Sequence, residues 1–487
     1  MSKRAFYLTT TLPYVNADPH IGFALEMVQA DIIARYRTLQ GDEVFFNTGT
    51  DEHGLKIYRK AKEEGKEPQA YTDEYAEKFR KLKDVLGLSE KLHFIRTTDP
   101  DHTKAAQELW RRCATSGDIY KKMYRGLYCV GDEAFIKETE LVNGKCPNHP
   151  NMDLVEIEEE NYFFKLKNYE SKLLAHLNKE GAVVPEWRRQ EAIQFVQHGL
   201  EDFSISRVKE KMPWGVAVPG DETQVMYVWF DALTSYISTL GWPFDPAQGK
   251  PDLFEKFWVN GFTLQLAGKD QVRFQSIMWQ AMLMSAGLPT TKQVFYHGFI
   301  TSGGQKMSKS VGNVIDPLAI VGEYGADALR YFLARHVHPF DDSDFTLEKF
   351  KEAYNADLAN GLGNLVARVM TMSSKYMSNP VEVPGITEVD VDVGMNISRF
   401  EFNQALIRTW ERIGHNDALI TLEKPFSAIN SGDVGVRQGA LLTIGKLVRE
   451  LYAIATEIEP FMPSAAGHIK KAVLANKKPE NLFPRKE

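Results

Sequence analysis

Cysteine is scarce in this chain: Cys113, Cys129 and Cys146 are the only three among 487 residues. Three thiols give no disulfide framework, and we expect a reducing, cytoplasmic setting. The sequence also has no apolar run near the roughly 18 residues that a membrane-spanning helix needs. Its start, MSKRAFYLTT, has neither the apolar core nor the cleavage site of a secretory signal. These absences predict a cytoplasmic protein without a membrane segment.

An excess of positive charge is lacking too. Lys and Arg number 58 against 65 Asp and Glu, a formal net charge of −7. Such a chain is not a general polyanion binder, so a nucleic-acid partner must meet a local basic patch. The length is too great for one ordinary core and suggests about three domains.

The first 50 residues have the pattern of strand, helix and strand. Residues 5–11 and 43–49 are rich in β-branched and aromatic types, as strands are. Between them, apolar residues recur every three or four positions from Ile21 to Leu39, and Gly41 ends the helix. This βαβ unit predicts a parallel sheet. A further helix is expected from Pro100 to Ser116.

The pattern changes along the rest of the chain. Residues 118–165 contain short strand-like runs, alternating strands and helices resume near residue 223, and helical periodicity dominates from about 346, with a loop at 379–395. The predicted fold class is α/β, a split Rossmann-type parallel-sheet domain with a small inserted module, followed by an all-α bundle. The expected domains are 1–117 and 223–299 (the two halves of the sheet domain), 118–222 (the insert), 300–350 (a lysine loop and stem-contact segment) and 351–487 (the bundle).

His20, Ile21 and Gly22 stand where the first helix begins. A helix start presents unpaired N–H groups and the positive end of a dipole, which suit an anion such as phosphate. We expect the N–H groups of Ile21 and Gly22 to serve as donors, and Gly22 to let a ligand approach the backbone. A three-letter match alone is equally compatible with an ordinary histidine in a loop.

A second motif, GGQKMSKSVGNVIDP at 303–317, contains Lys306 and Lys309 in a loop rich in Gly and Ser. Two such lysines can close over a polyphosphate and neutralise the charge that develops on departing pyrophosphate. The alternative is a solvated basic loop. The full Lys-Met-Ser-Lys-Ser string, together with His-Ile-Gly far upstream, makes that alternative improbable.

With these motifs in order, the chain resembles the class I methionyl-tRNA synthetases over essentially its whole length. Further matching stretches are TTTLPYVNADPHIG, NTGTDEHG, YVWFDALTSY, LAGKD, FYHGFITSGGQKMSKS, YGADALRYFL and NGLGNLVAR. The resemblance implies activation of L-methionine by ATP with Mg²⁺, then transfer to the 3′-terminal ribose of tRNA(Met), elongator and initiator. It implies a methionine–tRNA ligase (aminoacyl-tRNA synthetase).

The resemblance also implies the binding residues. The methionine site is expected to comprise Leu12, Tyr14, Asp51, Trp229, Ala232, Tyr236 and Gln275, with Asp51 meeting the substrate ammonium. A thioether needs an apolar, polarisable wall, which aromatic rings supply. The ATP site is expected to comprise His20, Gly22, Gly268, Lys269, Asp270, His297, Lys306 and Lys309, with His20, Lys306 and Lys309 as catalytic residues. From spacing alone, Trp229 and Tyr236 would be plain core aromatics on one helix face.

Three positions depart from the family pattern. Phe23 replaces the second histidine of the His-Ile-Gly-His box, Gln275 stands where many relatives have a histidine, and Phe426 where the bundle often has a tryptophan. We expect an active enzyme in which Phe23 packs as an apolar wall beside the nucleotide.

A possible metal site lies in the insert. Cys129-x-x-Asp132 and Cys146-x-x-His149 form two pairs separated by residues 133–145, a spacing that suits one structural Zn²⁺. Asp is a less favourable ligand than Cys beside thiolates. The alternative is a degenerate knuckle that packing alone holds together.

Anticodon binding is expected in the bundle, at Asn360, Asn364, Arg368 and Phe426. Amide and guanidinium groups suit the exposed edges of single-stranded bases. Residues 360, 364 and 368 are four apart, so a solvated helical face would fit the spacing equally well.

Two other functions share some of these features. A non-catalytic, tRNA-binding or regulatory paralogue is suggested by Phe23 and Gln275, although both lysines, Asp51 and Asp270 are intact. A small adenylyltransferase would need neither the lysine loop nor the bundle, and branched-chain relatives need a larger editing insertion. Because no further tRNA-binding domain follows the bundle, we expect a monomer.

Overall fold

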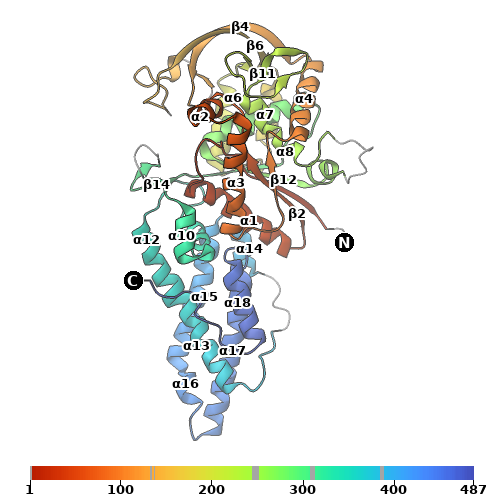
Figure 1. Cartoon of the computed structure of the whole chain (residues 1–487). Coiled ribbons are helices and arrows are strands. Elements are labelled where there is room, and N and C mark those ends of the chain that lie inside the picture. Colours follow the sequence, from red (N-terminus) through yellow and green to blue (C-terminus); the bar gives the residue numbers. More distant parts are fainter. Residues whose placement is uncertain are drawn as a thin grey trace. The chain divides into compact units, whose positions relative to one another are not determined.

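The computed structural model describes residues 3–131, 134–136, 138–147, 149–243, 252–307, 313–383 and 389–486. Its contacts divide the chain into two compact units that interleave in sequence. The sheet unit comprises Met1–Pro19, Glu43–Lys81 and Glu90–His297, and the bundle unit comprises His20–Asp42, Leu82–Ser89 and Gly298–Glu487. Figure 1 shows the elements of both.

A six-stranded sheet forms the centre of the sheet unit. Its strand order is β3-β2-β1-β12-β13-β7, and every neighbouring pair is parallel. The strands are β1 (Ala5–Thr9), β2 (Glu43–Thr50), β3 (Leu92–Arg96), β7 (Val183–Val184), β12 (Phe262–Gly268) and β13 (Gln293–His297). Nearly all residues of β1, β2 and β12 are buried, as expected of parallel strands covered on both faces. The predicted parallel Rossmann-type sheet is confirmed.

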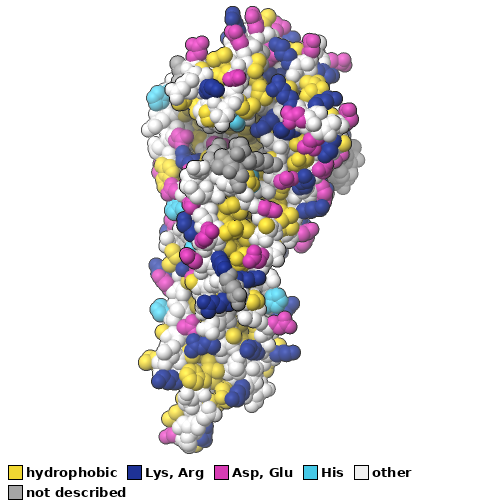
Figure 2. Space-filling view, turned by 60° about the vertical axis from the view of Figure 1, so that its left-hand side comes forward, with side chains coloured by type: hydrophobic (Ala, Val, Ile, Leu, Met, Phe, Trp, Pro, Cys, Tyr) yellow, Lys and Arg dark blue, Asp and Glu magenta, His cyan; other side chains and the backbone are white. Residues whose placement is uncertain are grey.

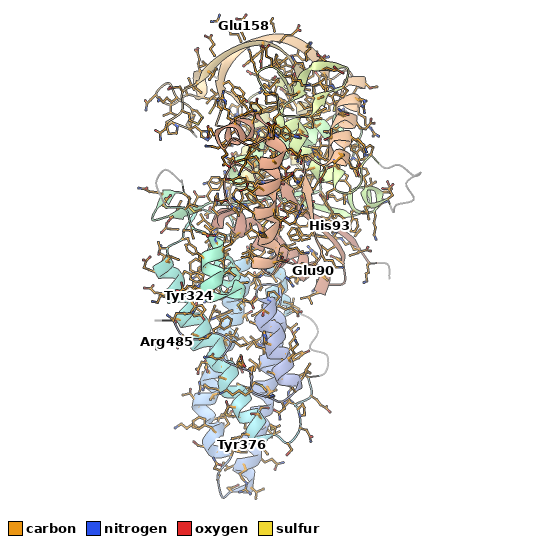
Figure 3. The ribbon with its side chains drawn as sticks, in the orientation of Figure 1. Glu90, His93, Glu158, Tyr324, Tyr376 and Arg485 are labelled. Carbon is orange, nitrogen blue, oxygen red and sulfur yellow. The ribbon has the colours of Figure 1, made fainter. Side chains whose placement is uncertain are left out.

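Helices and short helical turns pack around this sheet. They are α2 (Leu55–Glu63), α3 (Pro68–Val85), α4 (Pro100–Thr115), α5 (Glu170–Leu177), α6 (Glu186–Gln197), α7 (Val228–Leu233), α8 (Ser235–Ser238) and α9 (Trp279–Ser285), with π-helical segments η4 (Phe254–Val259) and η6 (Arg273–Met278). Trp258 and Trp279 lie fully buried in the core of this unit. In the edge strand β3, where Figure 3 labels His93, the ring of this residue stacks on Phe45 with 3.9 Å between ring centroids.

Two antiparallel sheets occupy much of the range predicted for the insert. One, in the order β5-β4-β6-β8, comprises β4 (Ile119–Cys129), β5 (Ala134–Ile136), β6 (Val155–Phe164) and β8 (Phe203–Ser204). The other comprises β9 (Ser206–Val208), β10 (Ala217–Val218) and β11 (Asp221–Met226). Strands therefore form where short strand-like runs were predicted. However, β7, also within residues 118–222, pairs with β13 of the central sheet.

The bundle unit is mainly helical, as predicted, and α13, α15, α17 and α18 lie alongside one another in it (Figure 1). Its helices are α1 (Ile21–Leu39), α10 (Pro317–Tyr324), α11 (Ala326–Arg335), α12 (Leu347–Ala353), the π-helical η7 (Tyr354–Gly363), α13 (Asn364–Tyr376), α14 (Val391–Ser398), α15 (Phe402–Glu423), α16 (Pro425–Ala428), α17 (Val434–Ile458) and α18 (Pro463–Leu474). A small sheet of β14 (Ile300–Ser302), β15 (Gln305–Lys306) and β16 (Ser343–Asp344) precedes most of them.

A buried ion pair joins the first helix to the later helices of the bundle unit. The guanidinium of Arg330 in α11 lies 2.8 Å from the carboxylate of Asp31 in α1, and neither side chain is exposed. Arg330 also donates to the carbonyl oxygens of Phe461 (2.7 Å) and Pro460 (2.9 Å). Burial lowers the pKa of this guanidinium while Asp31 opposes the change. The buried charge thus has a paired carboxylate and two carbonyl acceptors, although the effect of burial still outweighs that of Asp31.

Two local predictions differ from the structure. The loop expected at 379–395 ends at Asp390, because the Asp390 side chain accepts from the N–H of Asp392 and so begins α14. The helix that was to carry both Trp229 and Tyr236 is divided at Thr234 into α7 and α8. Across the part of the chain that the structure describes, no helix combines the length and apolarity that crossing a membrane requires.

Candidate active site

The carboxyl ends of the central strands bring most predicted substrate-binding residues of the sheet unit to one edge. Leu12 and Tyr14 follow β1, Asp51 follows β2, Asp270 follows β12, and His297 ends β13. The strand order changes direction at the β1–β12 pair, and ligands bind at this point in open parallel sheets. His297 is buried, whereas Asp270 is exposed in the turn after Gly268.

Asp51 is held beside the loop that contains Tyr14. The Asp51 N–H donates to the Pro13 carbonyl oxygen (3.0 Å), and the Val15 N–H donates to the Asp51 carbonyl oxygen (3.3 Å). These bonds place the backbones of Tyr14 and Asp51 in a parallel bridge. The Asp51 side chain is almost wholly buried, so its carboxylate lies beneath the surface at this edge of the sheet.

Aromatic rings form an apolar wall close to these residues. Trp229 stacks on Phe274 with 3.8 Å between ring centroids and 13° between planes. Tyr14, Trp229 and Phe274 all pack against the small buried cluster of Tyr227, Val228 and Met278. A flat, polarisable surface of this kind suits a sulfur-containing side chain.

Tyr236 and Gln275 form a buried hydrogen-bonded pair. The Gln275 amide donates to the Tyr236 hydroxyl at 2.6 Å and accepts from the Gln265 amide at 3.3 Å. The Tyr236 carbonyl oxygen accepts from the hydroxyl of Tyr7 at 2.7 Å. Gln275, one of the departures from the family pattern, thereby fixes the Tyr236 side chain.

A buried polar network that the sequence analysis missed lies next to this wall. Asp231 accepts hydrogen bonds from His53 (2.7 Å) and His102 (2.9 Å), and the other ring nitrogen of His102 lies 2.9 Å from the Ser238 hydroxyl. Burial raises the pKa of Asp231, but the two histidines outweigh that effect, and the net pKa falls to about 2. Since His53 follows Asp51 closely and Asp231 lies between Trp229 and Ala232, the network connects the two sides of the site.

An ion pair fixes the residue after Asp51. The Arg96 guanidinium makes two bonds to the fully buried Glu52 carboxylate, at 2.7 and 2.8 Å. Thr50 and Thr98 hydroxyls also donate to this carboxylate. The sequence offered only a weak signal for the two networks, namely Asp51 and Glu52 side by side in TDEHG and a single Asp231 within the apolar FDAL.

In the bundle unit, His20 caps the start of α1. Its Nδ1 accepts from the Gly22 N–H at 3.1 Å, while the Ile21 N–H donates to the Ile315 carbonyl oxygen at 3.1 Å. Each of these two N–H groups thus has an internal partner in the structure, and their expected role as phosphate donors stays a prediction. The Ile315 bond also joins the helix start to the end of the segment 303–317.

Gly22 is needed for a reason other than ligand approach. A Cβ at this position would lie 2.8 Å from Cε1 and 3.0 Å from Nδ1 of His20. The capping imidazole thus occupies the space that a side chain would fill. Phe23, half-buried, lies on the same imidazole, with ring centroids 4.3 Å apart. Lys306 pairs through its backbone with Thr301, and Lys309 lies outside the described residues.

Cys129, Cys146 and His149 form the group that could hold a metal. Their ligand atoms all lie within 4.8 Å of one another, with His149 Nδ1 at 3.7 Å from Cys129 Sγ and 4.0 Å from Cys146 Sγ. These separations suit ligands that surround one ion in tetrahedral coordination. Gly131 makes room for the imidazole, because a Cβ there would lie 2.4 Å from the ring. Asp132, the expected fourth ligand, lies outside the described residues.

The predicted anticodon residues lie on η7, α13 and α16 of the bundle unit. Asn360 and Asn364 are exposed and line one cavity of about 560 Å³. Arg368 Nη1 donates to Asp417 Oδ1 at 2.7 Å. Because η7 is π-helical, Asn360 and Asn364 are not spaced as on a regular α-helix. Phe426 is 47% exposed on α16 and does not line that cavity.

Comparison with known proteins identifies the family. The family model described as "tRNA synthetases class I (M)" matches residues 6–158 and 151–370. The chain is thus a class I aminoacyl-tRNA synthetase. The methionine–tRNA ligase of Thermotoga maritima is 39% identical, and the match covers 97% of this chain and 76% of that protein. The methionine–tRNA ligase of Rhizobium meliloti is also 39% identical, and the match covers 95% of this chain and 90% of that protein. The chain belongs to the methionyl-tRNA synthetase family.

Solved structures agree with this assignment. The Mycobacterium tuberculosis methionyl-tRNA synthetase in complex with methionyl-adenylate superimposes with a TM-score of 0.88, at 35% identity over 99% of both chains. The apo form of that enzyme superimposes with a TM-score of 0.83, at 32% sequence identity, and the match covers 100% of this chain and 99% of that chain.

Proposed function

We infer that the chain is a methionine–tRNA ligase, which activates L-methionine with ATP and transfers it to the 3′-terminal ribose of tRNA(Met). The observation that carries this inference is the aromatic wall of Trp229, Phe274 and Tyr14 beside the buried carboxylate of Asp51, at the carboxyl ends of the central strands. Such a site offers an apolar surface and a negative charge to one ligand, which matches an amino acid with a thioether side chain.

In the methionine site, Asp51 binds the ammonium group and Leu12, Trp229, Ala232 and Tyr236 surround the side chain. Gln275 acts on Tyr236, whose hydroxyl it holds at 2.6 Å. The indole Nε1 of Trp229 is buried and has no hydrogen-bond partner among the described residues, which leaves a donor for a ligand. The Asp231 network keeps the two sides of the site in register.

In the ATP site, Gly268, Asp270 and His297 bind the nucleoside, and His20, Lys306 and Lys309 bind the phosphates. Because His20 Nδ1 accepts from the Gly22 N–H, the proton of the neutral imidazole lies on Nε2, which can donate to a phosphate oxygen. The methionine carboxylate attacks the α-phosphorus in line, and the two lysines stabilise the departing pyrophosphate. Mg²⁺ supplies further neutralisation of the phosphate charge.

Zn²⁺ is the ion proposed for Cys129, Cys146 and His149, with Asp132 as the fourth ligand. Two thiolates and an imidazole are ligands that zinc prefers, and a closed tetrahedral site has a structural role. The ion would stabilise the segment between β4 and β6, in which Val130 and Cys146 are the only buried residues among those that the structure describes.

Anticodon binding is proposed for Asn360, Asn364 and Arg368, with Phe426 as a stacking surface. On the bundle face seen in Figure 2, Lys and Arg side chains are interspersed with apolar groups. A local surface of this kind can attract RNA although the net charge of the whole chain is −7.

Methionine-dependent ATP–pyrophosphate exchange by the wild type, His20→Ala and Lys309→Ala tests the catalytic assignment. Removing one preorganised donor should lower the exchange rate about 10²- to 10³-fold. We expect Lys309→Ala to lower the rate with little change in methionine affinity. A wild type no faster than His20→Ala would instead identify a non-catalytic tRNA-binding paralogue.

A further inference from the structure

Residues 477–486, here called the strap, run along the helical face that contains Asn360 and Asn364. At the start, the Asn476 amide donates to the Met377 carbonyl oxygen (2.9 Å) and accepts from the Ser373 hydroxyl (2.6 Å). The residue that precedes the strap is therefore bonded to the end of α13.

The far end of the strap is held equally firmly. Phe483 is buried with its ring edge-on to Tyr354, at 6.2 Å between centroids. The Tyr354 hydroxyl donates to the Pro484 carbonyl oxygen (2.9 Å), and Asn355 exchanges two hydrogen bonds with the Lys486 backbone (2.9 and 3.0 Å). With both ends anchored on η7 and α13, the middle of the strap is kept in place beside them.

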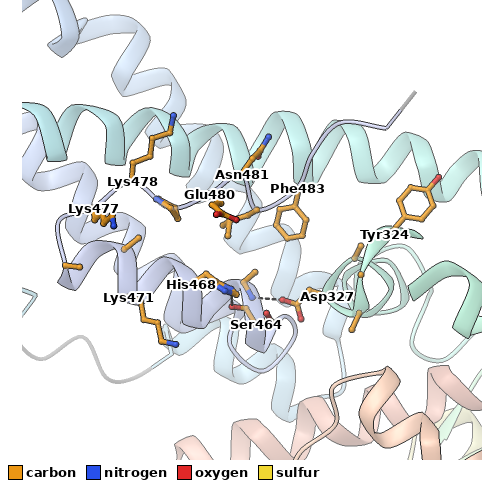
Figure 4. A pocket seen from close by; sticks show the side chains of 18 residues that line it. Tyr324, Asp327, Ser464, His468, Lys471, Lys477, Lys478, Glu480, Asn481 and Phe483 are labelled. Atoms are coloured by element: carbon orange, nitrogen blue, oxygen red, sulfur yellow. Dashed lines mark hydrogen bonds between the residues drawn. The ribbon is translucent and has the colours of Figure 1, made fainter. Parts of the chain in front are cut away.

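That middle portion presents polar side chains that have no partner among the residues that the structure describes. Lys478, Glu480 and Asn481 are exposed, and none makes a hydrogen bond or ion pair with another described residue. In Figure 4, Lys478 and Asn481 lie on the opposite side of the strap from the Phe483 ring. An anchored segment with unsatisfied polar groups has already lost the conformational entropy that ligand binding would otherwise cost.

These side chains and the predicted anticodon residues share one cavity. The strap residues Lys478, Glu480 and Asn481 line one side of the cavity of about 560 Å³, and Asn360 and Asn364 line the other. Its volume lies within the range of about 300–1,000 Å³ that small-molecule sites occupy. The cavity thus has the size and the polar lining to enclose a single nucleotide.

We propose that the strap is the second wall of a groove that receives one unstacked base of an RNA loop, whose edge carries an exocyclic amino group. The inference rests on the proposed role of Asn360 and Asn364 in anticodon binding. Lys478 meets the phosphate, and Asn481 bonds to the base edge through its amide. The carboxylate oxygens of Glu480 accept hydrogen bonds from an exocyclic amino group, so Glu480 favours cytosine or adenine over uracil.

Binding of the full chain to tRNA(Met) transcripts, in which each anticodon base is replaced in turn, tests this assignment. Lys478→Gln should weaken binding to every transcript about equally and reduce the slope of log K against log salt by about 0.7–1. Asn481→Ala and Glu480→Gln should reduce discrimination about tenfold at one anticodon position and not at the others. Lys477→Gln is the matched control, because Lys477 lines only the neighbouring cavity, of about 840 Å³, shown in Figure 4. Its binding should equal that of the wild type.

The variant Asn364→Ala separates this inference from the proposed function. If Asn364→Ala loses discrimination while the three strap variants bind like Lys477→Gln, the strap is no part of the groove and the inference is wrong. If Asn364→Ala keeps full discrimination, the anticodon assignment fails and the strap inference fails with it. Thermal melting of each variant, expected within a few degrees of wild type, shows that the changes act on binding.

Discussion

The phenyl ring of Phe23 supports the imidazole of His20, with ring centroids 4.3 Å apart and planes inclined by 32°. The departure from the family box therefore has a structural role at the helix start, because the Phe23 ring restrains the imidazole to which we assign a phosphate contact. Aromatic contacts of this kind contribute about 0.5–1.5 kcal/mol beyond area burial.

Phe23→Ala should cost much less exchange activity than His20→Ala, because the imidazole keeps its bond from Gly22. Truncating a fully buried phenyl ring would lower the free energy of unfolding by about 3–5 kcal/mol. Since the Phe23 ring is only half-buried, we expect Phe23→Ala to lower the free energy of unfolding by about 1–2 kcal/mol, as measured by denaturant unfolding. Equal activity losses in the two variants would contradict the supporting role.

Gly22→Ala should lower exchange activity, because the new Cβ would displace the His20 imidazole from its capping position. Gly414→Ala, in the helix α15 where a Cβ meets open space, is the matched control and should be neutral or slightly stabilising. The comparison uses exchange rates at saturating methionine. Full activity of Gly22→Ala would show that this rotamer of His20 is not required.

Arg368→Ala should weaken aminoacylation of tRNA and leave ATP–pyrophosphate exchange intact. The reason is that we assign this guanidinium, which lies 2.7 Å from the Asp417 carboxylate, to the proposed anticodon surface of the bundle unit. Arg408→Ala removes an exposed arginine that pairs within its own helix with Glu411, and serves as the control. A parallel fall in both reactions would indicate that Arg368 is structural.

Protein purified without chelator should contain close to one equivalent of zinc. Cys146→Ser should lose the metal, because a hydroxyl is a poor zinc ligand, whereas Cys113→Ser should retain it since Cys113 is buried elsewhere, in α4. Elemental analysis of both variants measures this. A wild type without metal would mean that packing alone holds the knuckle.

Asp231→Asn should destabilise the protein at neutral pH, and the difference from wild type should shrink below about pH 4. The folded pKa of about 2 lies under the unfolded value, so the ionised carboxylate stabilises the fold above the unfolded pKa. That stabilisation, about 2–3 kcal/mol, is lost as the pH falls toward 2. Unfolding free energies at pH 7, 5, 4 and 3 test this, with the exposed Asp101→Asn as control. A pH-independent difference would contradict it.

The parallel sheet and the bundle could be predicted because periodicity is a local property of the sequence. Pairings between distant residues could not: nothing local joins His53 to Asp231, or Ile21 to Ile315. Gly22 was interpreted as space for a ligand, since the sequence does not reveal that His20 folds back over it. Likewise, the role of the strap depends on where η7 lies, which no pattern in residues 477–486 indicates.

The ion pair of Arg330 with Asp31 also restricts how such a chain can be divided or recombined. A fragment beginning after residue 297 would retain the guanidinium without its carboxylate, leaving a buried charge that costs about 3–5 kcal/mol. The later helices of the bundle unit can therefore be transferred to another protein only together with α1, which contains Asp31. A chimaera between two relatives would keep this ion pair if both helices came from one parent.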